Sequence, residues 1–262
     1  MTPSKDYLWL NLRELPYFRA MLRAVEAQFY QQYDLPAPTL DIGCGDGHFA
    51  SVTFDRQLDV GLDPWSGPIH QAARAGGYRL LVQADGGKMP FTGAHFASAL
   101  SNSVLEHIPH VQVVLAELRR VLQPGAPFLF CVPNPRYLSE LSVPGLLGKA
   151  GLRRAGRAYM SWFQRMSRVA HAEWPDVWQK WLEQSGFHLE KWWHYFSPQA
   201  MRALEWGHYF GAPTLLPHAL IRHWIVAPWK WNLFLTERFV RRHAVAQPDP
   251  DGTFTFYVAR SV

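Results

Sequence analysis

Residues 40–48 of this sequence read Leu40-Asp41-Ile42-Gly43-Cys44-Gly45-Asp46-Gly47-His48. A short apolar run that ends in three alternate glycines predicts a strand turning tightly into a helix. Glycine lets the backbone of such a turn approach a ligand closely, and the helix N-terminus adds positive potential. The spacing is G-x-G-x-G and does not match the G-x-G-x-x-G fingerprint of dinucleotide-binding proteins. Asp41 puts a carboxylate just before the turn, where it would repel a pyrophosphate and attract a cationic amine.

Strand and helix patterns alternate on both sides of this turn. We expect strands at residues 39–42, 58–62, 78–83, 96–101, 127–132, 187–196 and 253–259. Helical patterns fall at residues 16–33, 67–76, 111–122, 146–170 and 175–184, with further helix starts at His48 and at Ser197-Pro198. Such alternation predicts an α/β fold with a doubly wound, mostly parallel, seven-stranded sheet and helices on both faces. Ligands of these sheets bind at the carboxyl ends of the strands.

The composition excludes several classes of protein. The chain has 262 residues, of which 48% are hydrophobic and 18% charged, so it is neither disordered nor collagen-like. Cys44 and Cys131 cannot build a disulfide framework and fit a reducing compartment. No apolar run has the length of a signal peptide or the roughly 18 residues of a spanning helix. We therefore expect a cytoplasmic protein.

Positive charge is concentrated in two segments. Residues 136–168 hold seven Lys and Arg residues against one acidic residue, and residues 198–243 hold six against two. Ten of the 12 tryptophans lie beyond residue 160. This asymmetry predicts an acidic partner, namely a membrane surface, a phosphate-bearing substrate or nucleic acid.

The two basic segments also define the expected organisation of the chain. We expect a single domain over residues 1–262, with an N-terminal helical segment at 1–37 and a cofactor-binding core at 38–134. A basic insertion at residues 135–174 follows the fifth strand and could form a lid. A second, aromatic insertion at residues 198–250 separates the last two strands.

Five motifs carry a resemblance to a known family. D-I-G-C-G-D-G-H-F resembles the first motif of class I S-adenosylmethionine-dependent methyltransferases, in the branch that includes quinone-biosynthesis and other small-molecule methyltransferases. The later motifs follow in order, as Gly61-Leu62-Asp63-Pro64, Gln83-Ala84-Asp85, the stretch from Ala99 to Ile108, and the stretch from Glu117 to Gly125. The resemblance covers residues 38–134. It implies a Rossmann-like fold, with S-adenosylmethionine as cofactor and S-adenosylhomocysteine as its product.

The resemblance also implies a set of cofactor-binding residues. These are Asp41, Gly43, Cys44, Gly45, Asp63, Pro64, Trp65, Asp85, Gly86, Ser101 and Asn102. Asp41 would face the methionine amino group, and Asp63 would accept hydrogen bonds from both ribose hydroxyls. Trp65 would flank the adenine, Asp85 would bind its amino group, and Ser101 would lie beneath the methionine part. Asp63 and Asp85 could alternatively be turn-forming residues.

The sequence departs from the family pattern at three places. Ser98 stands where the family has an acidic residue early in the fourth strand. Pro124-Gly125-Ala126 replaces the usual Pro-Gly-Gly, and Asp85-Gly86-Gly87 replaces a more common acid-Ala-acid pattern. Only the last departure bears on the cofactor, because it concerns the residue expected to bind adenine.

His107 is the candidate general base. Methyl transfer to an oxygen of high pKa needs a base, and imidazole titrates in the right range. The resemblance places His107 near the transferred methyl group, although the residue could instead shape the pocket or cap a loop. Weaker candidates are His110, His194, Tyr195 and His208. Neither H-x-x-x-H nor C-x-x-C spacing occurs, so no metal site is predicted.

The expected function is O-methylation of a small or lipid-linked substrate that is quinone-like, glycan-like or lipid-like. Residues 146–170 and 212–242 would dock on a membrane, with Trp224, Trp229 and Trp231 at the interface. The protein would then be peripheral at the inner membrane face. One alternative is a nucleic-acid methyltransferase, which the missing Asn-Pro-Pro-Tyr signature disfavours. A second alternative is a non-catalytic binding protein. A third is that both insertions form a lid and a dimer surface and make no contact with a membrane.

Overall fold

The structure is a computed structural model that describes residues 5–262, so the first four residues of the expected N-terminal segment lie outside it. The chain forms two compact units. The sheet unit contains Tyr30–Pro135, Arg168–His194 and Phe254–Val262. The helical unit contains the described residues up to Phe29, together with Arg136–Ser167 and Tyr195–Thr253. Most of both predicted insertions thus contributes to the helical unit, and the single domain remains a prediction.

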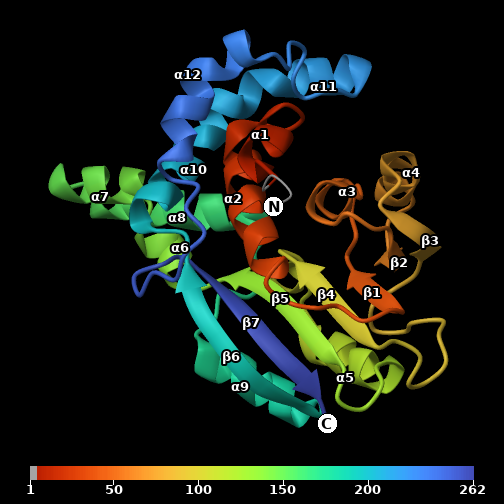
Figure 1. The fold of residues 1–262 in the computed structure, drawn as a ribbon. Helices are drawn as coiled ribbons and strands as arrows, with labels where there is room; N and C mark the ends of the chain where they lie inside the picture. Colours follow the sequence, from red (N-terminus) through yellow and green to blue (C-terminus); the bar gives the residue numbers. More distant parts are fainter. Residues whose placement is uncertain (1–4) are drawn as a thin grey trace. The chain divides into compact units, whose positions relative to one another are not determined.

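The sheet has seven strands in the order β3-β2-β1-β4-β5-β7-β6 (Figure 1). They are β1 (Thr39–Ile42), β2 (Leu58–Asp63), β3 (Tyr78–Gln83), β4 (Ser98–Asn102), β5 (Pro127–Pro133), β6 (Phe187–Tyr195) and β7 (Phe254–Ser261). The pairs β1–β2, β2–β3, β1–β4 and β4–β5 are parallel, whereas β7 runs antiparallel to β5. The predicted Rossmann-like, mostly parallel sheet is therefore confirmed.

Helices cover both faces of the sheet (Figure 1). One face carries α5 (Val111–Val121) and α9 (Pro175–Gln184), and the other carries α3 (His48–Thr53) and α4 (Ser66–Ala75). Leu40 and Ile42 of β1 belong to the same core cluster as Leu115 and Leu118 of α5. Because neighbouring residues of a strand face opposite ways, Asp41 lies on the other face of β1.

Two predicted elements have different bounds in the structure. The fourth strand begins at Ser98 rather than Phe96, because buried Phe96 makes only an isolated bridge to Leu122. The helix expected over residues 146–170 is wrong, since the chain forms α7 (Ser142–Lys149) and α8 (Arg153–Ser167) instead. The break falls at Gly151, whose φ of 78° is left-handed.

The helical unit also contains α1 (Tyr7–Leu12), most of α2 (Tyr17–Tyr30), α6 (Arg136–Ser139), α10 (Pro198–Gly211), the 3₁₀ turn η2 (Ala212–Thr214), α11 (Leu215–Ile221) and α12 (Lys230–Arg241). The expected start of α10 is confirmed, because Ser197 Oγ accepts a hydrogen bond from the Ala200 N–H at 3.2 Å. Helix α1 lies within the expected N-terminal helical segment, although no separate helix was predicted before residue 16. Its signal is Asp6, whose Oδ1 accepts from the Trp9 N–H at 3.1 Å.

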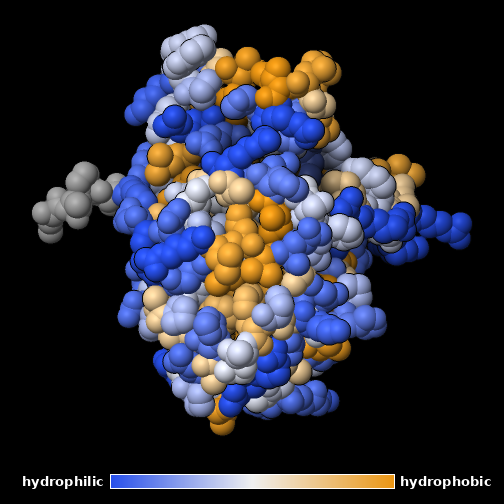
Figure 2. Space-filling model, turned by 90° about the vertical axis from the view of Figure 1, so that its right-hand side faces the viewer, coloured by the Kyte–Doolittle hydropathy of each residue, from blue (hydrophilic) through white to orange (hydrophobic). Residues whose placement is uncertain are grey.

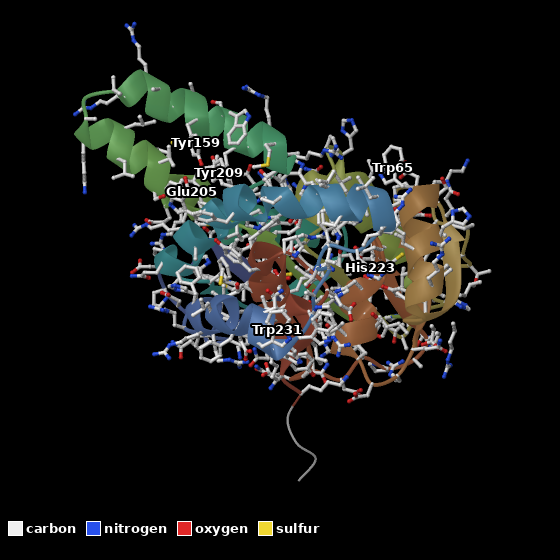
Figure 3. All side chains as sticks on the ribbon, turned by 90° about the horizontal axis from the view of Figure 1, so that it is seen from above. Trp65, Tyr159, Glu205, Tyr209, His223 and Trp231 are labelled. Carbon is white, nitrogen blue, oxygen red and sulfur yellow. The ribbon has the colours of Figure 1, made fainter. Side chains whose placement is uncertain are left out.

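A buried carboxylate joins α7 to α10 within the helical unit. Glu205 of α10 is fully buried and accepts hydrogen bonds from the Ser142 N–H at 2.6 Å and the Val143 N–H at 3.2 Å. The hydroxyl of Ser142 also donates to it, at 2.5 Å. Figure 3 shows Glu205 next to Tyr159 and Tyr209, whose hydroxyls are 2.6 Å apart. Glu205 therefore caps the first turn of a helix to which it does not belong.

Candidate functional site

The turn between β1 and α3 packs tightly against the chain that follows β4. Gly43, Gly45 and Gly47 have φ values of 73°, 55° and 74°, which are left-handed. A Cβ on Gly43 would lie 2.3 Å from Cγ1 of Val104, so the position has no room for a side chain. The N–H groups of Gly43 and Cys44 both donate to the Leu62 carbonyl, at 2.8 and 3.0 Å. These bonds hold the turn against the end of β2.

Asp63 ends β2 directly beside this turn. Its side chain is buried, and each carboxylate oxygen accepts one backbone N–H. Oδ2 accepts from Gly45 at 3.1 Å, and Oδ1 accepts from Trp65 at 2.9 Å. Two oxygens have about four lone-pair positions, so this carboxylate retains the capacity to accept two hydroxyls. A turn-forming role and a ligand-binding role are thus compatible in the same residue.

Asp41 is buried, and its carboxylate accepts a hydrogen bond from a tyrosine that was not predicted from the sequence. Tyr78, the first residue of β3, donates its hydroxyl to Asp41 Oδ2 at 2.5 Å. Burial and the nearby Asp41 charge raise the pKa of Tyr78 well above its ordinary value. The phenol therefore stays protonated and acts as a donor. The expected contact of Asp41 with the methionine amino group stays a prediction.

The residues expected around adenine lie at the ends of β2 and β3. Pro64 and Asp85 are exposed, and the Trp65 side chain is 71% exposed at the surface beside α4 (Figure 3). Asp85 Oδ1 accepts from the Gly87 N–H at 2.6 Å. A Cβ on Gly86 would lie 3.2 Å from Val114 Cγ1, so this turn too passes close to its neighbour. An exposed indole and a half-satisfied carboxylate suit an aromatic base with an amino group.

Ser101 and Asn102 end β4, next to β1 in the sheet. The Ser101 hydroxyl is buried and donates to the Ile42 carbonyl at 2.9 Å, and the Ser101 carbonyl accepts from Tyr30 Oη at 3.1 Å. The Asn102 Oδ1 lies 3.3 Å from Cys131 Sγ. These bonds tie β4 to its neighbours, so the Ser101 side chain has a structural task besides any contact with a cofactor.

Cys44 has no features of a reactive thiol. It is buried, and burial together with the charges of Asp41 and Asp63 raises the pKa of its thiol. A neutral thiol is a poor nucleophile and a poor metal ligand. Within residues 5–262, no group of His, Cys, Asp and Glu side chains could hold a metal ion.

His107 lies in a 3₁₀ turn, η1 (Leu105–His107), that follows β4. Its Nδ1 is 3.0 Å from the Arg168 carbonyl oxygen, and a carbonyl only accepts, so Nδ1 carries the proton. Nε2 is then the basic nitrogen, 3.8 Å from Oε1 of buried Glu106. Partial burial, with the Arg168 charge, lowers the pKa of His107 below its ordinary 6.5. The imidazole is therefore neutral at pH 7 and able to accept a proton.

The segment that contacts His107 was missed from the sequence. The N–H groups of Ala170 and His171 donate to the Glu106 carbonyl at 2.7 and 3.0 Å. His171 Nε2 lies 3.0 Å from the Ile108 carbonyl oxygen. Residues 168–171 thus hold the η1 turn from the other side, although the sequence pattern assigned residues 168–170 to the end of a long helix.

Within the sheet unit, the residues around β1 and β2 fit S-adenosylmethionine chemically. Asp63 offers paired acceptors to a vicinal diol, Trp65 an exposed ring to a base, and Gly43 a backbone without a side chain. Of the weaker candidates for a base, His110 is the N-cap residue of α5, and His194 bonds to Thr255 Oγ1 at 2.7 Å. Tyr195 and His208 belong to the helical unit.

Comparisons with known proteins point the same way. The family described as a methyltransferase domain matches residues 40–130. An uncharacterized methyltransferase of Mycobacterium marinum is 37% identical over 89 residues, which is 33% of this chain and 35% of the relative. A fatty-acid O-methyltransferase of Mycolicibacterium smegmatis is 36% identical over 103 residues, 37% of this chain and 38% of the relative. The chain thus spans about a third of the length of these curated relatives.

Solved structures share the fold over a longer stretch. The geranyl diphosphate C-methyltransferase of Streptomyces coelicolor, crystallised with S-adenosyl-L-homocysteine, matches with a TM-score of 0.57. The match covers 94% of this chain and 84% of that chain at 13% identity. A possible histamine N-methyltransferase of Thermotoga maritima matches with a TM-score of 0.54 at 14% identity, over 93% of this chain and 90% of that chain. At such low identities the likeness shows the fold alone.

Proposed function

We propose that this protein, whose residues 40–130 form a class I S-adenosylmethionine-dependent methyltransferase domain, catalyses the O-methylation of a small or lipid-linked substrate. The observation that carries the proposal is the carboxylate of Asp63. It lies at the carboxyl end of β2, is oriented by two backbone N–H groups, and adjoins a glycine turn with no room for a side chain. When bound, S-adenosylmethionine supplies an electrophilic methyl group on a sulfonium.

The chain's own residues bind and orient the donor. Asp63 would hold the ribose hydroxyls, while Trp65 and Asp85 would hold the adenine. Asp41 would attract the positively charged amino group of the methionine part, and Tyr78 fixes the orientation of that carboxylate. Fixing the donor in this way converts a bimolecular displacement into one within a complex, which is the main source of rate in such a reaction.

His107 would remove the proton of the acceptor hydroxyl. Its Nδ1–H is held by the Arg168 carbonyl, which leaves Nε2 to accept that proton. The lowered pKa of His107 keeps Nε2 unprotonated at neutral pH. Glu106 Oε1, 3.8 Å away, would stabilise the imidazolium formed after proton transfer.

Two observations support a small or lipid-linked acceptor, and both are indirect. The Mycolicibacterium smegmatis relative is a fatty-acid O-methyltransferase, although the shared stretch covers 38% of it. The helical unit contains many exposed aromatic and aliphatic side chains, which suit an apolar substrate. In this proposal the protein works in the cytoplasm, and a dimer is compatible with it. A nucleic-acid substrate and a purely binding role are the alternatives.

Calorimetric titration with S-adenosylmethionine and S-adenosylhomocysteine tests the donor site first. Asp63→Asn keeps the size of the side chain but removes the charge that favours two hydroxyl donors. We expect its affinity for both compounds to be at least about tenfold weaker, since hydrogen bonds to charged groups are the strong ones. The matched control is Asp34→Asn, an exposed carboxylate in the same unit, which should bind as the wild type does.

Two results would overturn the proposal. The first is no binding of either compound by folded wild-type protein, as judged by circular dichroism. The second is equal binding by wild type and Asp63→Asn, which would place the donor elsewhere. If the donor binds as expected, transfer of a radiolabelled methyl group to fatty acids, quinols and glycans would identify the acceptor class.

A further inference from the structure

The helical unit exposes an unusual amount of apolar surface in one stretch of chain. Among the described residues, 24 large hydrophobic side chains are exposed, and 13 of them lie between Trp206 and Phe239. In Figure 2, apolar side chains gather at the top of the picture, the level at which α11 and α12 lie in Figure 1. Soluble proteins rarely leave contiguous apolar patches of this kind without a partner.

Helix α12 has its apolar residues on the outside. Trp231, Phe234 and Leu235 fall on one face at helical spacing and are 75%, 56% and 76% exposed. The opposite face contributes Leu233 and Val240, the two buried residues of the helix. A helix that only had to cover a protein core would turn its larger apolar residues inward. Figure 3 shows Trp231 projecting from α12 at the surface.

Helix α11 extends the same surface. None of its residues is buried. Leu216, Leu220 and Ile221 are 66%, 74% and 53% exposed. The connection to α12 adds Trp229, 56% exposed, whose ring stacks on that of Trp231 at a centroid distance of 6.0 Å. We call residues 215–238 the α11–α12 face.

The charge of the α11–α12 face has one sign. The sequence from Trp206 to Thr236 contains no acidic residue and includes Arg222 and Lys230. Arg238 follows one turn after Leu235 on the outer side of α12 and is exposed. Glu237, the one acidic residue of the face, pairs with Arg241. The apolar residues are therefore bordered by cations.

A groove continues the apolar surface between α10 and α12. Its volume is about 550 Å³, and its walls include Trp206, Phe210, Leu235 and Phe239. Each of these four side chains is at least 40% exposed. The groove has the size and apolar lining of a site that can take a hydrocarbon chain.

We propose that the α11–α12 face docks on the surface of an anionic lipid bilayer, with Trp231, Leu235 and Leu220 in the interface and Arg222 and Arg238 at the headgroups. Tryptophan side chains favour the interface between headgroups and acyl chains, and anionic lipids attract the bordering cations. None of the helices in the described part of the chain has the length and hydropathy of a membrane-spanning helix.

Charge complementarity selects the bilayer over a second copy of the chain. A symmetric dimer formed through this face would offer its cations no available acidic partner, because Glu237, its one acidic residue, already pairs with Arg241. A soluble polyanion would satisfy the cations and leave the tryptophan and leucine side chains in water. An anionic bilayer provides partners for both kinds of side chain.

Cosedimentation with vesicles tests the proposal without substrate or cofactor, and so does not rest on the proposed function. We expect wild-type protein to bind phosphatidylcholine vesicles that contain phosphatidylglycerol, and to bind pure phosphatidylcholine far more weakly. High salt should weaken the binding. Asp63→Asn should bind vesicles as the wild type does, so a failure of docking and a failure of donor binding are separate results.

Two double variants separate the apolar and ionic contributions. Trp231→Ser/Leu235→Ser should weaken binding at least about tenfold, because it removes apolar area from the interface. Arg222→Gln/Arg238→Gln should weaken it about fivefold for each cation removed. The matched controls lie in the sheet unit: Val113→Ser/Leu80→Ser for exposed apolar residues and Arg74→Gln/Lys180→Gln for exposed cations. Both controls should bind vesicles as the wild type does.

Three results would overturn the proposal. One is a failed vesicle assay, in which wild-type protein does not bind anionic vesicles or the face variants bind them as well as their controls do. Another is a dimer in sedimentation velocity that the Trp231→Ser/Leu235→Ser variant loses, which would assign the face to a second copy. The third is retention of a duplex oligonucleotide that depends on Arg222 and Arg238 while vesicles are not bound, which would assign the face to nucleic acid.

Discussion

Among single residues, His107 gives the most specific prediction, because its proposed role as a base fixes how activity should depend on pH. Partial burial lowers the pKa of His107 below 6.5, the ordinary pKa of a histidine side chain. The imidazole is therefore protonated only at a pH below that value. A base must be unprotonated to act, and activity should therefore fall as the pH falls through this lowered pKa. In the pH profile of kcat/KM, we expect an acidic limb that lies below pH 6.5.

Substitution of His107 separates catalysis from pocket shape. His107→Ala should lower kcat by about 10²–10⁴-fold and abolish the acidic limb, while the affinity for S-adenosylhomocysteine stays unchanged. His110→Ala is the matched control, as an exposed histidine three residues away. A His107→Ala enzyme that keeps the wild-type pH profile would show that this imidazole only shapes the pocket.

At the scale of elements, the β1–α3 turn depends on a glycine at a position with no room for a side chain. Alanine at Gly43 would combine a left-handed φ of 73° with a Cβ 2.3 Å from Val104. Gly43→Ala should destabilise the protein by about 1–3 kcal/mol and weaken donor binding, because the turn must move away from Val104. Chemical denaturation and calorimetry measure the two effects.

Two further variants identify the cause. Gly67→Ala lies in α4, where a Cβ meets nothing within 4 Å, and should be neutral or slightly stabilising. Gly43→Ala/Val104→Ala removes the contacts with the two Cγ atoms of Val104 but keeps a Cβ at 2.9 Å and the strained φ, so it should recover only part of the lost stability. An unchanged stability for Gly43→Ala would contradict the packing described here.

The start of α7 provides a second prediction at this scale. Glu205 is fully buried and satisfies the N–H groups of Ser142 and Val143, which have no partner within their own helix. Glu205→Ala should lower the free energy of unfolding by about 2–4 kcal/mol, since buried donors are left unpaired. Hydrogen exchange should accelerate in α7, while the β1–β4 amides remain protected.

The controls for Glu205 separate hydrogen bonding from charge. Glu205→Gln retains one acceptor oxygen and should fall between wild type and alanine. Glu140→Ala breaks the ion pair with Arg202, whose side chains are 28% and 49% exposed, and should change stability little. Equal effects of Glu205→Ala and Glu140→Ala would contradict a capping role.

At the scale of the whole molecule, the sequence predicted the two units unequally well. Strands β1 and β2 of the sheet unit could be located because each is a short apolar run that ends at a glycine or an aspartate, as at Ile42-Gly43 and Leu62-Asp63. The motif residues could be assigned because they follow those strand ends directly. The sheet order and the antiparallel β7 agree with the predicted fold class.

The helical unit was harder to predict for a physical reason. Its apolar residues do not all face a core, so the apolar residues of 212–235 show no clear helical period and no helix was predicted there. The structure has α11 and the start of α12 in this stretch. In the sheet unit, Tyr78 was missed because its partner Asp41 comes from another strand. The contact of residues 168–171 with the η1 turn also joins distant parts of the chain, and no local pattern signals such pairs.

The place of β7 in the sheet has a consequence for biosynthesis. β7 lies between β5 and β6, so its neighbours are made before it and stay apart until it arrives. During translation, β5 is therefore an open edge and β6 has no neighbour until residues 254–261 leave the ribosome. Closing this gap brings together segments more than 100 residues apart, a slow step in folding. A nascent chain stalled before residue 254 would expose two unpaired strands to aggregation and proteolysis.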